Sequence, residues 1–177
     1  MEHHFLPYSH NIIFFDTEFS SLDPYIGEIL SIGLVKINGE ELYLELKYDG
    51  PIDEWVLQNI IPTLTETKYP REMVIQRIND FIADSNPYLI AFVNQYDSIY
   101  LYKLFNQIKK PFHWLPIDFA SILFSLRIDP ETYMPDNSNC FLRNIGIDLS
   151  KYHQHNSLDD AKLLRDVYLK LTDYSNK

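Results

Sequence analysis

The chain has 177 residues, of which 46% are hydrophobic and 15% aromatic, and its formal net charge is −10. This composition excludes a disordered chain and predicts a single globular domain over residues 1–177. The acidic balance excludes a protein that follows long duplex with a basic face, because such binding needs clustered lysine and arginine. A nucleic-acid ligand would therefore be short, or held through metal ions and local contacts.

Cysteine content and the apolar segments indicate the compartment. The single cysteine, Cys140, permits no internal disulfide and is typical of a reducing environment. No apolar stretch approaches ~18 residues, so no membrane contact is expected. The start, Met1-Glu2-His3-His4, lacks the basic and apolar segments of a signal peptide. The sequence thus predicts a cytoplasmic protein.

Strand signals come first along the chain. Residues 12–19 and 29–37 are apolar and rich in β-branched or aromatic side chains. Asn38-Gly39 follows the second run and is a strong hairpin signal, and residues 41–47 alternate between polar and apolar. These features predict an antiparallel three-stranded meander.

Helix signals dominate the remainder. Helices are expected at 53–61, 71–84, 97–108 and 157–171, with a short strand at 88–93. Residues 117–126 fit either a strand or a helix, and residues 130–139 are expected to form a loop. The order predicts an α/β fold whose mixed sheet combines the meander with parallel strands and is flanked by helices.

The most informative feature is a pair of carboxylates inside the first strand. Asp16 and Glu18 lie two residues apart, so they project from the same face. Two such anions at about 4 Å repel by roughly 4 kcal/mol at an effective dielectric of ~20. The pair therefore predicts a divalent metal site. The alternative is that the two residues simply end the strand and enter a loop.

Two later aspartates begin apolar stripes. Asp97 precedes Leu101, Leu104 and Ile108 by four, seven and eleven residues, and Asp160 precedes Leu164, Val167 and Leu171 by the same steps. These steps define one face of a helix, so each aspartate heads a stripe that faces the core. Asp159 falls on the charged side instead, and periodicity therefore selects Asp160.

A role in starting the helix is the alternative for both aspartates. Aspartate is favoured in a first turn by capping and by the helix dipole, and Ser157-x-x-Asp160 resembles a capping box. His155 precedes Asp160 by five residues, a step of about 140° in a helix. His155 can share a site with Asp160 only from the loop before the helix, and the alternative is a surface histidine.

Three motifs in this order resemble those of the DEDDh 3′–5′ exonucleases, which have the RNase H-like fold. They are Phe15-Asp16-Thr17-Glu18-Phe19, Asn94-Gln95-Tyr96-Asp97 and His155-Asn156-Ser157-Leu158-Asp159-Asp160-Ala161. The matches run from residue 12 to about residue 171. The histidine step separates this class from relatives that use tyrosine in the third motif. The chain looks most similar to small stand-alone bacterial exoribonucleases, and Glu54-Trp55-Val56-x-x-Asn59-x-x-Pro62 carries part of that similarity.

The resemblance implies a 3′–5′ exoribonuclease that releases nucleoside 5′-monophosphates from short single-stranded RNA or 3′ overhangs. Asp16, Glu18, Asp97 and Asp160 would bind two Mg²⁺ or Mn²⁺ ions, which prefer oxygen ligands and act as a two-metal site. His155 would be the general base, because imidazole exchanges a proton near neutral pH. A homodimer is compatible with the resemblance, since dimers are common among the small members.

Four residues are candidate substrate contacts: Thr17, Phe19, Ser20 and Asn94. Phe19 is expected either to stack on a terminal base or to fill the core. Ser20 and Asn94 are candidates for the terminal sugar or phosphate. Ser20-Ser21 stands where many members have Thr-Gly, which leaves the contact to the 3′ end open. Tyr96 stands where phenylalanine is usual before Asp97, and neither departure removes a metal ligand.

Three rival functions stay open from the sequence. The first is the same chemistry on DNA, as a proofreading or repair exonuclease. The second is a non-catalytic nucleic-acid-binding module on the same fold. The third is hydrolysis of small nucleotides or dinucleotides.

Overall fold

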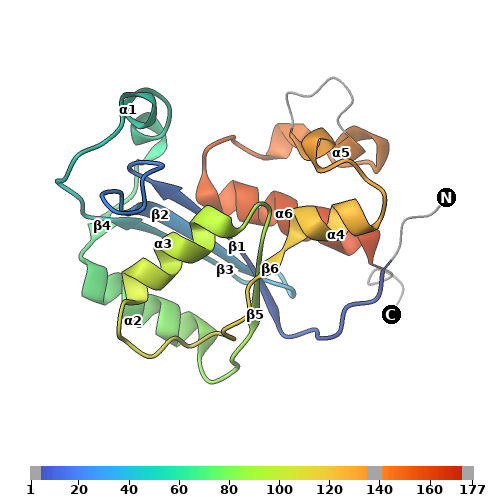
Figure 1. Ribbon diagram of the computed structural model, residues 1–177, viewed down its shortest axis with the longest axis horizontal. Helices are drawn as coiled ribbons and strands as arrows, with labels where there is room; N and C mark the ends of the chain where they lie inside the picture. The colour runs from blue at the N-terminus through green and yellow to red at the C-terminus, as the bar shows by residue number, and fades with distance from the viewer. Residues whose placement is uncertain (1–4, 135–140, 173–177) are drawn as a thin grey trace.

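The structure, a computed structural model, describes residues 5–134 and 141–172. Its centre is a six-stranded sheet with the order β4-β3-β2-β1-β5-β6 (Figure 1). The strands are β1 (Ile12–Phe19), β2 (Ile29–Lys36), β3 (Glu41–Leu46), β4 (Lys68–Tyr69), β5 (Tyr88–Ala91) and β6 (Ile117–Asp118). The α-helices are α1 (Glu54–Asn59), α2 (Arg71–Ile82), α3 (Gln95–Phe105), α4 (Phe119–Ser125), α5 (Phe141–Asn144) and α6 (Ser157–Leu171). The 3₁₀ helices are η1 (Ile61–Thr63), η2 (Pro130–Tyr133) and η3 (Leu149–Lys151).

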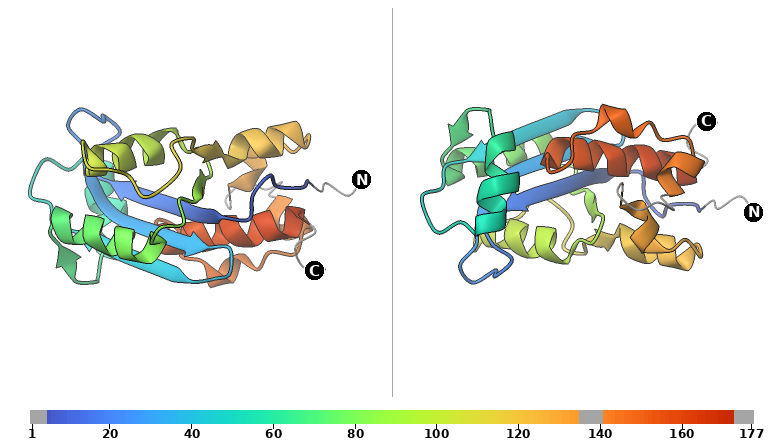
Figure 2. Two further views of the ribbon diagram at one scale, coloured as in Figure 1. Left: turned by 90° about the horizontal axis from the view of Figure 1, so that it is seen from below. Right: turned by 90° about the horizontal axis from the view of Figure 1, so that it is seen from above.

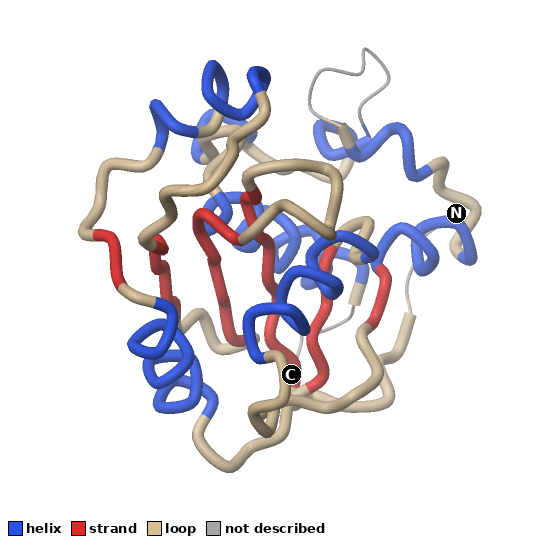
Figure 3. The backbone as a smooth tube through the Cα atoms, turned by 60° about the vertical axis from the view of Figure 1, so that its left-hand side comes forward, coloured by secondary structure: helices blue, strands red, loops and turns tan. Residues whose placement is uncertain are grey.

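The mixed sheet confirms the predicted fold class. β1, β2 and β3 form the expected antiparallel meander, with Asn38-Gly39 in the turn between β2 and β3. Gly39 has φ +93°, a conformation that glycine adopts without strain. β5 pairs parallel with β1, and β6 pairs parallel with β5. Figure 3 shows the strands in the middle of the molecule with the helices around them.

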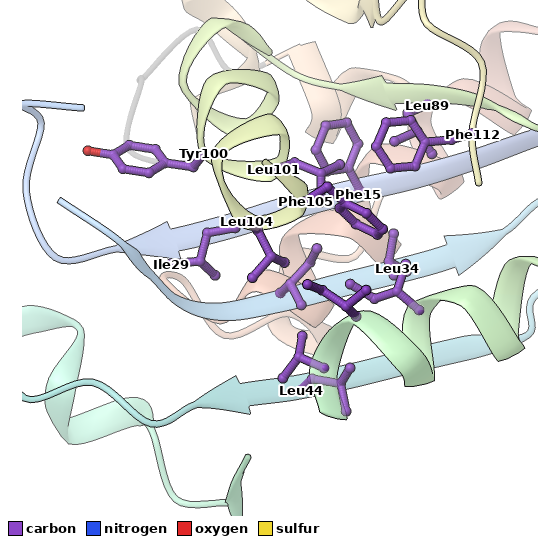
Figure 4. Close-up of a cluster of buried hydrophobic side chains, with 14 of the residues drawn as sticks. Phe15, Ile29, Leu34, Leu44, Leu89, Tyr100, Leu101, Leu104, Phe105 and Phe112 are labelled. Carbon is purple, nitrogen blue, oxygen red and sulfur yellow. The ribbon is translucent and has the colours of Figure 1, made fainter. Parts of the chain in front are cut away.

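Different helices cover the two faces of the sheet (Figure 2). Strand alternation in β1 sends Ile13 and Phe15 into the core under α2 and α3. Figure 4 shows Phe15 among the side chains of this core. Ile12 and Phe14 enter a second core under α4 and α6. A third, smaller cluster lies under α1 and η1 and consists of Leu30, Val56, Ile60 and Leu64.

The structure changes several predicted boundaries. The helix expected at 97–108 is α3, which begins at Gln95 and ends at Phe105 because Asn106 takes a left-handed conformation with φ +46°. Ile108 therefore lies beyond the helix and is exposed, so it is not part of the buried stripe. Residues 117–126 divide between β6 and α4, so both readings of that segment were partly right.

The remaining differences concern short elements. The expected loop at 130–139 begins with η2, and residues 135–139 lie outside the described residues. β4 and α5 were missed because they are too short to show a period. No helix in the described parts of the chain is both long and apolar enough to cross a bilayer.

Candidate metal centre

Strand β1 divides three consecutive side chains between the two faces of the sheet. Asp16 and Glu18 continue the row of Ile12 and Phe14 on the α6 face, as expected from their spacing. Thr17 points to the opposite face, toward α3. All three lie near the carboxyl end of β1, beside the end of the parallel strand β5, where α/β sheets commonly bind ligands.

Helix α6 brings Asp160 to the same place. The N-cap of α6 is Asn156, whose Oδ1 accepts hydrogen bonds from the backbone N–H groups of Leu158 and Asp159. The capping box starting at Ser157 was therefore wrong, because Ser157 is already inside the helix. Asp160 is therefore not the second residue of a capping box. Leu164, Val167 and Leu171, which share its face of the helix, are buried as expected.

A glycine in β2 permits the close approach of α6. A Cβ atom on Gly33 would lie 2.2 Å from the Ser157 carbonyl oxygen and 2.4 Å from the Leu158 Cα. Gly33 pairs with Asp16 across β1 and β2. The backbone of α6 therefore rests directly on Gly33, and this contact places Asp160 beside Asp16.

Three of the predicted ligands already form a group that could hold a metal ion. One carboxylate oxygen from each of Asp16, Glu18 and Asp160 lies within 4.8 Å of the others. Opposite oxygen ligands of an octahedral Mg²⁺ ion stand about 4.0–4.2 Å apart, given bonds of about 2.0–2.1 Å. The spacing and the all-oxygen donor set fit a hard divalent cation after small side-chain adjustments.

The fourth predicted ligand, Asp97, is held beside this group by Thr17. Oδ1 of Asp97 accepts hydrogen bonds from the Thr17 backbone N–H at 2.8 Å and from Thr17 Oγ1 at 2.7 Å. Asp97 is only 8% exposed and lies in the first turn of α3. Asp97 does not join the three-oxygen group, but its charge acts on Asp16, Glu18 and Asp160.

Burial raises the pKa of all four carboxyl groups, and the charge of neighbouring carboxylates adds to the rise for Asp16, Glu18 and Asp160. Burial is the largest cause throughout: it raises the pKa of Glu18 to about 8, of Asp160 to about 7 and of Asp97 to about 6. The pKa of Asp16 also lies well above its ordinary value, through burial and the charges of the other three. The two Thr17 hydrogen bonds lower the pKa of Asp97 and limit its rise. Four ionised carboxylates are therefore disfavoured here without a cation.

His155 lies in the turn just before α6, as predicted for a residue that shares the site with Asp160. Its backbone is left-handed, with φ +61°, and a non-glycine residue in this region costs about 1–3 kcal/mol. A hydrogen bond from the His155 backbone lowers the pKa of Asp160, so the two residues are in direct contact. The imidazole is exposed and lines the same cleft as the carboxylates.

The cleft over the carboxylates has a volume of about 300 Å³. All five predicted catalytic residues, Asp16, Glu18, Asp97, His155 and Asp160, line this cleft together with Thr17 and Phe19. One face of Phe19 stacks on Tyr100, with ring centroids 4.5 Å apart and planes at 15°. Phe19 thus both packs on the core and borders the cleft, and base stacking by Phe19 stays a prediction.

Ser20 and Asn94 are placed differently from the other candidates. Neither is found among the described residues that line the cleft. Ser20 is fully buried, and its Oγ accepts a hydrogen bond from the Glu28 backbone N–H. Asn94 is the N-cap residue of α3, and its Oδ1 accepts from the Ser98 hydroxyl. Both side chains support the walls of the site, and their contact to substrate stays a prediction.

Trp55 and Thr63 contact His155 and were not among the sequence candidates. The Trp55 ring packs against the His155 imidazole, and the Thr63 hydroxyl lies 3.1 Å from the His155 carbonyl oxygen. The segment 54–62 carried part of the family resemblance, which was the available signal for Trp55. Thr63 gave no signal, because only the fold brings it near His155.

No family model and no curated protein matches the sequence. The fold, in contrast, is similar to that of exonuclease I. Exonuclease I from Methylocaldum szegediense superposes with a TM-score of 0.66 over 90% of this chain, at 18% identity. The zinc-bound Escherichia coli exonuclease I complex with single-stranded DNA gives 0.70 at 15% identity, and the complex with a dT13 oligonucleotide gives 0.68 at 16%, each over 90% of this chain.

These similarities show the class of fold: an RNase H-like exonuclease fold. The chain spans about two-fifths of the exonuclease I chains, 39% in the first case and 40% in the other two.

Proposed function

We propose that this chain is a metal-dependent 3′–5′ exonuclease of the DEDDh type, formed as one domain over residues 1–177. It removes nucleoside 5′-monophosphates from the 3′ end of short single-stranded or overhanging RNA. The observation that carries the proposal is that carboxylate oxygens of Asp16, Glu18 and Asp160 lie within 4.8 Å of one another, in a cleft that Asp97 and His155 also line. The exonuclease I fold supports the same reaction class.

The four carboxylates would hold two Mg²⁺ or Mn²⁺ ions. Bound there, the ions would supply an activated water and neutralise charge on the phosphate. Their positive charges also offset the repulsion that raises the pKa of Glu18 to about 8 and of Asp160 to about 7. His155, at the mouth of the cleft, accepts the proton of the attacking water. Thr17 holds Oδ1 of Asp97, so Oδ2 would be the ligand atom.

A time course on end-labelled RNA tests reaction class and polarity together. The substrates are single-stranded and 3′-overhung RNA of equal sequence, incubated with Mg²⁺, with Mn²⁺ or with a chelator. We expect stepwise shortening from the 3′ end that depends on the metal. Endonucleolytic products, or equal degradation in the chelator, would contradict the proposal.

The variant His155→Ala tests the general base. We expect turnover to fall by about 10²- to 10⁴-fold, the usual contribution of a general base, while metal binding is retained. His153→Ala is the matched control, since His153 is also an exposed histidine of this turn but pairs with Asp159 instead. Near-normal Mg²⁺-dependent activity of the His155 variant would remove His155 from this role.

DNA is the second candidate substrate, and one observation favours it. The exonuclease I structures with the same fold are described as complexes with single-stranded DNA oligonucleotides. Rates on 5′-labelled RNA and DNA oligomers of equal sequence separate the two candidates. Titration calorimetry with Mn²⁺ separates both from a non-catalytic binding module, for which no metal binding is expected.

A further inference from the structure

Helix α1 and the following 3₁₀ helix η1 each contact His155. The Trp55 ring of α1 meets the imidazole edge to face, with ring centroids 5.2 Å apart and planes at 88°. The Thr63 hydroxyl of η1 lies 3.1 Å from the His155 carbonyl oxygen and 2.8 Å from the Ile60 carbonyl oxygen. One hydroxyl proton is shared between these two acceptors, so Thr63 ties the turn before α6 to η1.

The segment that makes these contacts is itself fixed to the sheet. Glu18 pairs with Ser31 and Phe19 pairs with Ile29, so Leu30 is an extra residue in β2. A bulge of this kind re-aims a side chain at the edge of a ladder. Leu30 packs in the small buried cluster with Val56, Ile60 and Leu64, which anchors α1 and η1.

The backbone at His155 needs such support. His155 is a non-glycine residue with φ +61°, a conformation that persists only when the surroundings impose it. Its backbone also contacts Asp160 through a hydrogen bond. Three segments therefore contact His155. Trp55 of α1 contacts its ring, Thr63 of η1 contacts its carbonyl group, and Asp160 of α6 accepts a hydrogen bond from its backbone.

We propose that α1 and η1 are a positioning element for His155, in which Trp55 orients the imidazole and Thr63 holds the backbone. The inference rests on the proposed function, because the orientation matters only if His155 exchanges a proton with the attacking water. Trp55 is 55% exposed, so direct stacking of a substrate base on its ring is the competing role.

Kinetics of paired variants test the positioning role. Trp55→Ala should lower kcat by about tenfold to a hundredfold with little change in KM, because displacement of a catalytic group by about 1 Å has effects of this size. Thr63→Val should lower kcat in the same way. The conservative variants Trp55→Phe and Thr63→Ser keep a ring and a hydroxyl, and should restore most of the rate. Leu57→Ala, at an exposed position of the same helix, should leave kcat unchanged.

A double-mutant cycle with His155→Ala separates the two roles of Trp55. If Trp55 acts through His155, adding Trp55→Ala to His155→Ala should cause no further loss. A full additional loss in the double variant, or a raised KM with unchanged kcat in the single variant, would overturn positioning and indicate direct stacking on substrate.

Proton NMR of the metal-free protein gives a readout that does not need activity. The Trp55 ring current should shift the His155 imidazole protons, and Trp55→Ala should move these resonances, whereas Leu57→Ala should not. Unchanged His155 resonances would overturn the inference. A wild-type protein without nuclease activity but with the expected shifts would refute the proposed function alone, and the packing of Trp55 on His155 would stand.

Discussion

At the scale of single residues, the pleat of one strand assembles most of the candidate centre. Asp16 and Glu18 face α6 and meet Asp160, whereas Thr17 faces α3 and holds Asp97. A shift of one residue in β1 would exchange these roles, because alternate side chains lie on opposite faces. Burial also raises the pKa values of these carboxyl groups. A bound cation would offset this by favouring their ionised form.

Replacing the predicted ligand Asp16 by its neutral amide should raise the stability of the metal-free protein and abolish metal binding. Burial and three neighbouring carboxylates raise the pKa of Asp16, so Asp16→Asn should increase the free energy of unfolding of the metal-free protein at pH 8. The same variant should lose the stabilisation by Mn²⁺ and the nuclease activity. Chemical denaturation in EDTA measures the stability of the variant, and denaturation in Mn²⁺ measures the stabilisation by metal. The RNA time course measures the activity.

Asp159→Asn is the control for this prediction. Asp159 is the sequence neighbour of Asp160, but its carboxylate pairs with His153 at 2.8 Å on the outer side of α6. Stabilisation by Mn²⁺ should therefore persist in Asp159→Asn. Persistence of the Mn²⁺ effect in Asp16→Asn as well would show that Asp16 is not a ligand.

At the scale of elements, the position of α6 on the sheet decides whether the carboxylates meet. The first turn of α6 lies against Gly33, and the hydroxyl groups of Ser31 and Ser157 form a buried hydrogen bond of 3.0 Å in the same contact. Both contacts come from β2, next to the strand that carries Asp16 and Glu18. The distance from helix to sheet thus sets the distance between ligands.

A methyl group at Gly33 should disturb this contact and the site together. The atoms that it would meet belong to the backbone of Ser157 and Leu158, so α6 must move. We expect Gly33→Ala to lower the free energy of unfolding by about 1–3 kcal/mol, a usual cost of overpacking, and to weaken Mn²⁺ binding. Denaturation and metal titration of the same preparations measure the two effects.

Gly39→Ala provides the matched glycine control. Gly39 has φ +93°, so alanine is strained there, but its Cβ would come no closer than 3.6 Å to the atoms around it. This variant should lose stability without losing metal affinity. A Gly33 variant that behaves in the same way would mean that α6 does not set the ligand spacing.

At the scale of the whole molecule, the net charge leads us to expect that substrate binding depends on metal. The chain carries a net charge of −10, and no lysine or arginine is found among the described residues that line the cleft. Phosphate groups of a substrate therefore meet carboxylates and ring edges rather than basic side chains. Metal ions would supply the positive charge that phosphate binding normally draws from lysine and arginine.

The raised pKa values predict how stability changes with pH. As the pH rises from about 4, the folded, metal-free protein keeps protons that the unfolded chain has lost. Asp97 keeps its proton to about pH 6, Asp160 to about pH 7 and Glu18 to about pH 8. Because the folded state then binds more protons, the contribution of this site to the free energy of unfolding is present at pH 4 and is lost as the pH rises toward 8. Denaturation midpoints in EDTA across this range measure the effect.

Mn²⁺ provides the second arm of the pH experiment. The ion binds the ionised carboxylates, so its stabilising effect should grow as the pH rises over the same range. The variant Glu18→Gln should flatten the dependence measured in EDTA. Stability in EDTA that rises toward pH 8, with no flattening in Glu18→Gln, would contradict the repulsion among these groups.

The sequence by itself determined the elements and the carboxylates that they carry. Periodicity placed Asp16 and Glu18 on one strand face and Asp160 at the head of a buried stripe, because both patterns arise from neighbours within a few residues. The turn at Asn38-Gly39 and the helix at Ser157–Leu171 were predictable for the same reason. His155 was predictable only through the step of five residues to Asp160.

Only the tertiary structure decided how these parts are held. Thr17 supports Asp97 across 80 positions of sequence, and Thr63 contacts His155 across 92. Asn156 rather than Ser157 caps α6, and Gly33 lies under the helix, because the fit of α6 on the sheet selects where the helix begins. Such contacts join segments that carry no mutual pattern in sequence, so packing alone determines which of the polar residues face the cleft and which, like Ser20, support its walls.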